Sequence, residues 1–205
     1  MTTVTALTTE ELVGLAPVVP VVVINDLADA VPLASALVRG GLPAIEVTLR
    51  TPAATAAIER IANEVPGAVV GAGTVTTSRQ VADALAAGAR FLVSPGSTPR
   101  LLDAMQASGV PFLAGTATAS DVLALLERGL TYAKFFPAEA MGGVKTLKAF
   151  AGPFPQMRFC PTGGIDVAKA PEYLALPNVV CVGGSWMTAG DVETLAAEAA
   201  SLAVQ

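Results

Sequence analysis

The sequence predicts an α/β protein with a (β/α)₈ TIM-barrel fold, a single domain over residues 1–205 with a short N-terminal helix. Three observations predict this fold. Short runs rich in β-branched residues recur eight times, and the stretches between them have the pattern of helices. The runs begin on average about 23 residues apart, which leaves room for one strand, two loops and one helix in each unit.

The expected strands are mostly apolar along their whole length, as in a parallel sheet that is covered on both faces. In chain order they are Val18–Ile24, Ala44–Leu49, Ala68–Ala72, Arg90–Ser94, Val110–Ala114, Tyr132–Phe136, Met157–Pro161 and Val179–Val182. An open doubly wound sheet would satisfy the same local pattern. Its nucleotide-binding fingerprint is missing, because Gly71–Thr76 has a threonine where the third glycine belongs. We therefore prefer the closed barrel.

Three stretches between these strands carry clear signals for both helix ends. They are Leu27–Arg39, Pro52–Glu64 and Ser78–Ala87. Each begins near a polar residue or a proline and is followed by glycine or by proline and glycine, the asymmetry typical of helices.

Composition excludes several classes of function. The 205 residues include 12 basic and 17 acidic side chains, a net charge of −5, so we expect no nucleic-acid partner and no anionic membrane surface. The chain has no histidine, which removes the Ser-His-Asp and Cys-His nucleophile pairs and any His-ligated metal site. We expect neither a metal nor another cofactor.

The remaining features favour a cytoplasmic protein. Cys160 and Cys181 are too far apart for a Cys-x-x-Cys motif and too few for a disulfide framework, so we expect both to be reduced and buried. The first 12 residues lack the basic and apolar regions of a signal peptide. Prolines and glycines interrupt every uncharged stretch, so we expect no membrane helix.

The second strand carries a polar face. Glu46, Thr48 and Arg50 alternate with apolar residues, so they share one face of the strand and would point into a barrel near the carboxyl end of its strands. Active sites of barrels lie at that end. This face is therefore a candidate for catalysis.

Lys134 in the sixth strand is the candidate nucleophile. It lies among aromatic residues, and loss of solvent favours the neutral amine that a Schiff base requires. The other three lysines fall in helical segments, where exposed ends are expected. The alternative is that Lys134 and Glu46 form a buried ion pair that only holds the strands in register. Arg50 favours catalysis, since its fork suits a substrate carboxylate and such a pair would not need it.

Two glycine-rich segments follow the seventh and eighth strands. Gly163-Gly164 and Gly183-Gly184-Ser185 would let backbone N–H groups approach an anion, where barrels commonly hold phosphate. The alternative for either segment is a tight turn with no ligand. A third segment, Gly71–Thr74, would shape the cavity floor or supply one hydroxyl.

With these residues the chain resembles the 2-keto-3-deoxy-6-phosphogluconate (KDPG) aldolases. The resemblance extends over nearly the whole chain. The shared segments are Val18–Val21, Glu46–Arg50, Gly71–Val75, Ser94–Gly96, Lys134–Glu139, Gly142–Lys145, Gly152–Phe154, Arg158–Gly164 and Gly183–Trp186. The segments that contain Lys134 and Thr162 are specific to the family. The resemblance implies one metal-independent class I aldolase domain that assembles as a homotrimer.

The resemblance also implies roles for individual residues. Lys134 would form the Schiff base and Glu46 would move protons. Arg50 and Thr74 would bind the pyruvyl carboxylate, and Thr162 the keto acid. The expected pocket walls are Pro95 and Phe136, and the expected phosphate ligands are Gly163, Gly164, Gly184 and Ser185. The ligands would be the phosphorylated keto acid and its products, pyruvate and glyceraldehyde 3-phosphate.

One segment departs from the family pattern. After the fifth strand the chain has Ala114–Thr118, Ala-Gly-Thr-Ala-Thr, where the family usually has Pro-Gly-Ile-Ser/Met-Thr. This difference alters the cavity wall and affects the aldehyde preference rather than the imine chemistry. Two alternatives to a KDPG aldolase remain open: an aldolase for 4-hydroxy-2-oxoglutarate or 2-keto-3-deoxy-6-phosphogalactonate, and an inactive barrel that binds phosphosugars or serves in an assembly.

Overall fold

The computed structural model describes residues 7–204 and contains one sheet of eight parallel strands. The strands are β1 (Val18–Val22), β2 (Ala44–Thr48), β3 (Val69–Gly73), β4 (Leu92–Val93), β5 (Phe112–Thr116), β6 (Tyr132–Phe135), β7 (Arg158–Pro161) and β8 (Val182–Gly184). Their order in the sheet is β7-β6-β5-β4-β3-β2-β1-β8. Each strand from β1 to β6 therefore lies beside the next one in the sequence, and β1 also pairs with β8.

The sheet closes into a barrel between β7 and β8. Two isolated parallel bridges join this region, one between Phe159 and Val179 and one between Thr162 and Gly183. The predicted (β/α)₈ fold is confirmed. The alternative of an open sheet is wrong, because the strand order never reverses and no edge remains where a doubly wound sheet would end.

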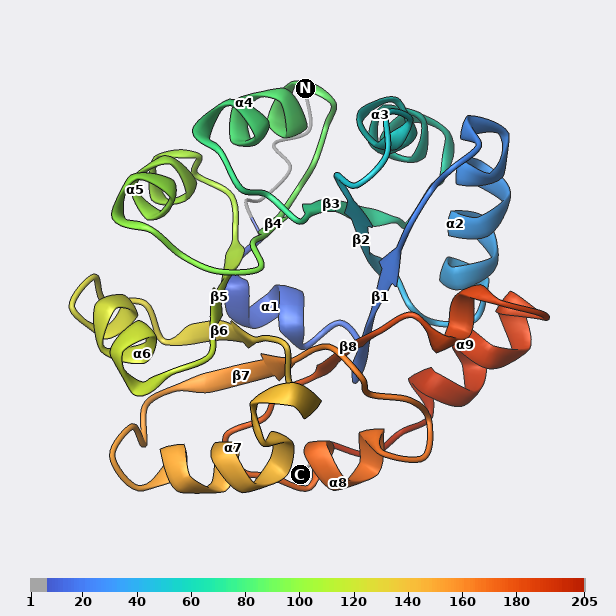
Figure 1. The fold of residues 1–205 in the computed structure, drawn as a ribbon. Helices are drawn as coiled ribbons and strands as arrows, with labels where there is room; N and C mark the ends of the chain where they lie inside the picture. Colours follow the sequence, from blue (N-terminus) through green and yellow to red (C-terminus); the bar gives the residue numbers. More distant parts are fainter. Residues whose placement is uncertain (1–6, 205) are drawn as a thin grey trace.

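Helices surround the ring of strands, as Figure 1 shows. The α-helices are α1 (Thr9–Val13), α2 (Ala30–Arg39), α3 (Ala54–Glu64), α4 (Ser78–Ala86), α5 (Pro99–Ala107), α6 (Ala119–Leu126), α7 (Gly143–Ala151), α8 (Ala170–Leu174) and α9 (Val192–Ala200). Short 3₁₀ turns are η1 (Leu27–Asp29), η2 (Glu139–Met141) and η3 (Trp186–Thr188). Among residues 7–204, every helix is too short or too polar to cross a membrane.

The apolar core has two layers. The outer layer lies between the strands and the helices and includes Ile45 and Val47, whereas Ala44 belongs to the inner layer inside the ring. The predicted alternation of β2 is therefore confirmed. Helix α1 closes one end of the barrel, because its Leu12 and Val13 pack into the inner layer (Figure 1).

The two cysteines also belong to the inner region. Cys160 and Cys181 are free and buried, as the sequence predicted. A hydrogen bond with Cys160, together with burial, raises the pKa of the Cys181 thiol. A protonated thiol inside the barrel behaves as a small apolar group.

The eighth strand differs from the sequence prediction. It was expected at Val179–Val182 but lies at Val182–Gly184, so Gly183 and Gly184 are strand residues and not part of a turn. The reason is register with a distant strand, since they pair with Val19 and Pro20 of β1. An apolar run by itself does not reveal this pairing.

Candidate active site

Lys134 and Glu46 meet inside the barrel. They belong to β6 and β2, which lie four strands apart in the ring of eight and so face each other across it. Lys134 Nζ lies 3.1 Å from Glu46 Oε1 and 3.5 Å from Oε2. Only 4% of the lysine side chain and 3% of the glutamate side chain are exposed. A buried pair of this kind is costly to desolvate, so stability alone is a weak reason for its presence.

Neighbouring residues shape the space around this pair. Lys134 Nζ lies 5.3 Å from the ring centroid of Phe136, within range of a cation–π interaction. Gly73 of β3 makes room for the glutamate, since a Cβ atom there would lie 2.2 Å from Glu46 Oε1. Thr48 Oγ1 donates to the carbonyl of Val22. Of the polar face predicted on β2, Glu46 therefore reaches the lysine, whereas Thr48 binds backbone.

Arg50 and Thr74 come together where β2 and β3 end. Arg50 Nε donates to Thr74 Oγ1 over 3.0 Å, and the guanidinium is exposed. Among residues 7–204, no carboxylate forms an ion pair with Arg50. Thr74 has a φ of +57°, a left-handed conformation that is strained for a β-branched residue. In this strained conformation Thr74 presents its hydroxyl to an arginine that is available to bind an anion.

Thr162 and the glycines after it lie at the seam of the barrel. Thr162 is buried, and Gly183 opposite leaves the room that its hydroxyl occupies. Gly163 and Gly164 have φ values of +105° and +79°, which favour glycine. A Cβ atom on Gly163 would lie 3.3 Å from the Phe136 ring, so this turn borders the lysine site.

The end of β8 contributes Gly184 and Ser185. Gly184 is buried, and its missing side chain leaves room for the ring of Trp186, because a Cβ atom would lie 1.8 Å from Cζ3. Ser185 is exposed, and its carbonyl accepts from Thr188. Packing thus accounts for the glycine at 184, while the hydroxyl of Ser185 is accessible to a ligand.

Pro95 borders the segment that departs from the family pattern. Gly115 of β5 packs directly against it, since a Cβ atom there would lie 2.2 Å from the carbonyl carbon of Pro95. In the sheet Gly115 is the partner of Lys134, and Thr116 Oγ1 donates to the Lys134 carbonyl over 3.1 Å. Ala114–Thr118 therefore forms the wall directly beside the lysine strand.

Comparisons with known proteins identify the family. The family model described as KDPG and KHG aldolase matches residues 9–200. A 2-dehydro-3-deoxy-phosphogluconate aldolase of Pseudoalteromonas atlantica is 54% identical over 175 residues, which cover 85% of this chain and 81% of the relative. A KHG/KDPG aldolase of Escherichia coli is 52% identical over 182 residues, covering 89% of this chain and 85% of the relative. The chain belongs to the KDPG and KHG aldolase family.

Solved structures agree with this assignment. A 2-keto-3-deoxy-6-phosphogluconate aldolase of Zymomonas mobilis, crystallised with 3-phosphoglycerate, superimposes with a TM-score of 0.93 at 50% identity over 96% of both chains. A KDPG aldolase of Legionella pneumophila with pyruvate captured as a covalent carbinolamine has a TM-score of 0.92 and 46% identity over 95% of this chain and 98% of that one. The protein is thus a lyase, an aldolase, and we set aside the alternative of an inactive barrel.

The aldolase also has a charged cluster to which the sequence analysis assigned no role. Lys169 is exposed, as expected, and its Nζ also lies 2.9 Å from Glu139 Oε2, while the hydroxyl of Tyr173 donates to Oε1. These two donors lower the pKa of Glu139. The hydrogen bond with Glu139 raises the pKa of Lys169, and burial raises that of Tyr173. The feature of the sequence that could have revealed this cluster is Glu139, which ends the family-specific segment Lys134–Glu139.

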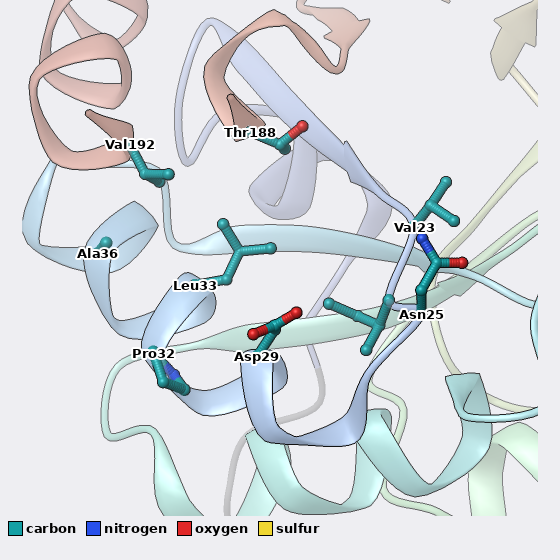
Figure 2. Close-up of a pocket in the computed structure, with 9 residues that line it drawn as sticks. Val23, Asn25, Asp29, Pro32, Leu33, Ala36, Thr188 and Val192 are labelled. Atoms are coloured by element: carbon teal, nitrogen blue, oxygen red, sulfur yellow. The ribbon is translucent and has the colours of Figure 1, made fainter. Parts of the chain in front are cut away.

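One pocket of the barrel lies away from the predicted site residues. This pocket has a volume of about 420 Å³ and lies between α2, the chain after β1, and the segment from η3 to α9. Figure 2 shows the residues that line it. Its lining includes Val23, Asp29, Leu33 and Thr188 but none of the predicted site residues. Within residues 7–204, no three Cys, Asp or Glu side chains gather closely enough to hold a metal ion.

Proposed function

We propose that this aldolase reversibly cleaves 2-keto-3-deoxy-6-phosphogluconate to pyruvate and glyceraldehyde 3-phosphate through a Schiff base on Lys134. The observation that carries the proposal is the buried contact of 3.1 Å between Lys134 Nζ and Glu46 Oε1. It supports the roles of nucleophile and base for these two groups, because they lie within hydrogen-bonding distance inside the barrel. The relatives named for this substrate and the covalent pyruvate adduct of the Legionella pneumophila enzyme support it.

Glu46 is positioned to take a proton from the Lys134 ammonium group. The free amine then adds to the C2 ketone of the substrate, and Glu46 returns the proton to the carbinolamine hydroxyl, which leaves as water to give a protonated imine. This imine accepts the electron pair of the C3–C4 bond as that bond breaks, while Glu46 removes the proton of the C4 hydroxyl. The aldehyde leaves, the enamine takes a proton at C3, and water releases pyruvate and restores the amine.

Arg50 and Thr74 are the proposed ligands of the substrate carboxylate. The Arg50 guanidinium uses Nε to bind Thr74, which leaves its terminal nitrogens for the carboxylate oxygens. Pro95 and Phe136 would form the pocket walls, and Thr162 would contact the keto acid. These assignments place the carboxylate near the ends of β2 and β3.

Gly163, Gly164, Gly184 and Ser185 are the proposed phosphate ligands. They follow β7 or end β8, which are neighbours at the seam of the barrel. Positive φ values at Gly163 and Gly164 allow the backbone to approach an anion, and Ser185 adds an exposed hydroxyl. The phosphate and the carboxylate would thus bind on opposite sides of Lys134.

We further propose that the enzyme is a cytoplasmic homotrimer that uses no metal or other cofactor. Two free, buried thiols suit a reducing compartment. The trimer is what the resemblance to the KDPG aldolases implies. Sedimentation equilibrium of the purified protein tests the trimer.

Reduction with borohydride in the presence of pyruvate tests the Schiff base. We expect the chain to gain the mass of one reduced pyruvyl group, located by peptide mapping on the peptide that contains Lys134. Lys134→Met is the control and should gain none. Failure of the wild-type peptide to gain this mass would show that the proposed mechanism is wrong.

A second substrate has support from the comparisons. The family model and the Escherichia coli relative are both named for KHG, which is 4-hydroxy-2-oxoglutarate, as well as for KDPG. Cleavage of 4-hydroxy-2-oxoglutarate would use the same lysine and the same carboxylate site. Comparing kcat/KM for the two substrates decides which is preferred, and the wall formed by Ala114–Thr118 is where we expect the preference to arise.

A further inference from the structure

Three successive carbonyl groups of the turn after β7 accept hydrogen bonds, two from the loop after β6 and one from Lys169. The Thr162 carbonyl accepts from Ala138 N over 2.8 Å, and the Gly163 carbonyl accepts from Glu139 N over 3.1 Å. The Gly164 carbonyl accepts from Lys169 Nζ over 2.9 Å. Each of these carbonyls thus points toward a donor outside the turn.

The direction of each carbonyl determines the direction of the next N–H group. In a trans peptide the C=O and N–H of one unit point in opposite directions. The N–H groups of Gly164 and Ile165 therefore point away from the donors that hold the Gly163 and Gly164 carbonyls. Among residues 7–204, neither N–H donates a hydrogen bond. Adjacent N–H groups that share a direction form a concave site for an anion.

Glu139 and Lys169 support this arrangement with their side chains. Lys169 Nζ bridges the Gly164 carbonyl and Glu139 Oε2, 2.9 Å from each. The Glu139 side chain packs against the turn, since a Cβ atom on Gly164 would lie 2.7 Å from its Cγ. Tyr173 is only 1% exposed, and its hydroxyl donates to the other carboxylate oxygen of Glu139. The carboxylate is thus held from two sides.

The charge of Glu139 needs compensation if the turn binds phosphate. A carboxylate packed against Gly164 would repel an anion bound there, and the Lys169 ammonium offsets that charge. The lysine therefore has two effects: it holds the Gly164 carbonyl, and it neutralises the acid beside it.

We propose that Lys169 and Glu139, held by Tyr173, are positioning residues for the substrate phosphate, because they direct the N–H groups of Gly164 and Ile165 toward it. This inference rests on the phosphate-binding role proposed above for the turn. The residues act through the backbone of the turn and do not touch the reacting atoms.

Lys169→Met tests this role with two substrates, KDPG and its unphosphorylated analogue 2-keto-3-deoxygluconate. We expect the ratio of KM for KDPG to KM for the analogue to rise about fivefold, with kcat for KDPG unchanged, because one charged hydrogen bond and one half-exposed ion pair are lost. Lys169→Arg should restore most of the ratio, since it keeps a charged donor. Lys148→Met removes an exposed lysine from α7 and is the matched control.

Three outcomes would overturn the inference. These are an unchanged KM ratio, an equal loss with both substrates, and a fall in kcat alone. If Lys169→Met does not fold, Tyr173→Phe supplies the same measurement, because it keeps the ring and removes only the donor to Glu139; an unchanged ratio there also overturns it. Wild-type protein that fails to cleave KDPG would instead contradict the proposed function, so the two failures are distinguishable.

Discussion

Gly73 leaves the space that the carboxyl group of Glu46 occupies. The residues lie on adjacent strands, and a Cβ atom at position 73 would lie 2.2 Å from Glu46 Oε1 and 2.4 Å from its Cγ. The carboxylate can therefore reach Lys134 across the barrel only because the neighbouring strand has no side chain at this point.

We expect Gly73→Ala to displace this carboxylate from Lys134. A displacement of about 1 Å in a catalytic group can lower kcat by about 10²-fold, and we expect a loss of that size in the rate of pyruvate release. Gly152→Ala is a suitable control, since a Cβ atom there meets nothing within 4 Å. An unchanged kcat for Gly73→Ala would show that the position of Glu46 is not limiting.

Lys134→Met should abolish turnover and also destabilise the fold. It leaves the Glu46 carboxyl group, 3% exposed, without its cation, and breaking a buried pair in this way costs about 3–5 kcal/mol in the free energy of unfolding. Adding Glu46→Gln should recover most of this loss, because it removes the unpaired charge. Urea unfolding of the two single variants and the double variant measures the coupling. Additive effects would show that the ion pair contributes no stability.

Thr74→Gly should make the protein more stable and its substrate binding weaker. Glycine relieves the strain of the φ value of +57°, which costs about 1–3 kcal/mol for other residues, although added freedom of the unfolded chain offsets part of the gain. The variant also loses the hydroxyl that accepts from Arg50, so KM should rise. Melting temperature and KM together check this, with Thr74→Ser as the variant that keeps the hydroxyl. A lower melting temperature would contradict the strain argument.

Ser185→Ala should raise KM for the phosphorylated substrate and leave kcat nearly unchanged. The hydroxyl is exposed at the end of β8, and its proposed contact with phosphate would be equal in the ground and transition states. Steady-state kinetics with KDPG measures both constants. A change in kcat alone would count against phosphate binding by this residue.

The Glu139 cluster should make the free energy of unfolding depend on pH in the acidic range. Hydrogen bonds from Tyr173 and Lys169 lower the pKa of Glu139 below its ordinary value of 4.5. Its contribution to stability is therefore fully present above pH 4.5 and is lost as pH falls through the lowered pKa of the folded state. The margin in urea midpoint between wild type and Glu139→Gln should be largest at neutral pH and shrink in acid. A margin that does not vary with pH would contradict this origin.

The strand pattern predicted most of the fold because local sequence carries it. Continuous apolar runs with a regular spacing indicate buried parallel strands, and the closed order of those strands follows once each unit packs beside the next. The predicted position of β8 was wrong, because Gly183 and Gly184 join the sheet only by pairing with Val19 and Pro20, which are far away in the sequence. Glycine by itself predicts a turn.

The residues of the candidate site were likewise predicted only in part. Alternation along β2 predicted that Glu46 points inward, and the aromatic setting of Lys134 selected it from the four lysines. The cluster of Lys169, Glu139 and Tyr173 was missed, because an exposed lysine just before a helix has no local signal for its partner. The roles assigned to the binding residues stay predictions.

By itself the sequence determined which chemistry is open to this protein: without histidine and with a lysine in an apolar strand, it favoured imine formation. Only the tertiary structure decided how close the two groups lie, because Lys134 and Glu46 are separated by 88 residues and meet across the width of a closed barrel. Periodicity reports the face on which a side chain lies. The distance between two faces depends on how the whole ring closes.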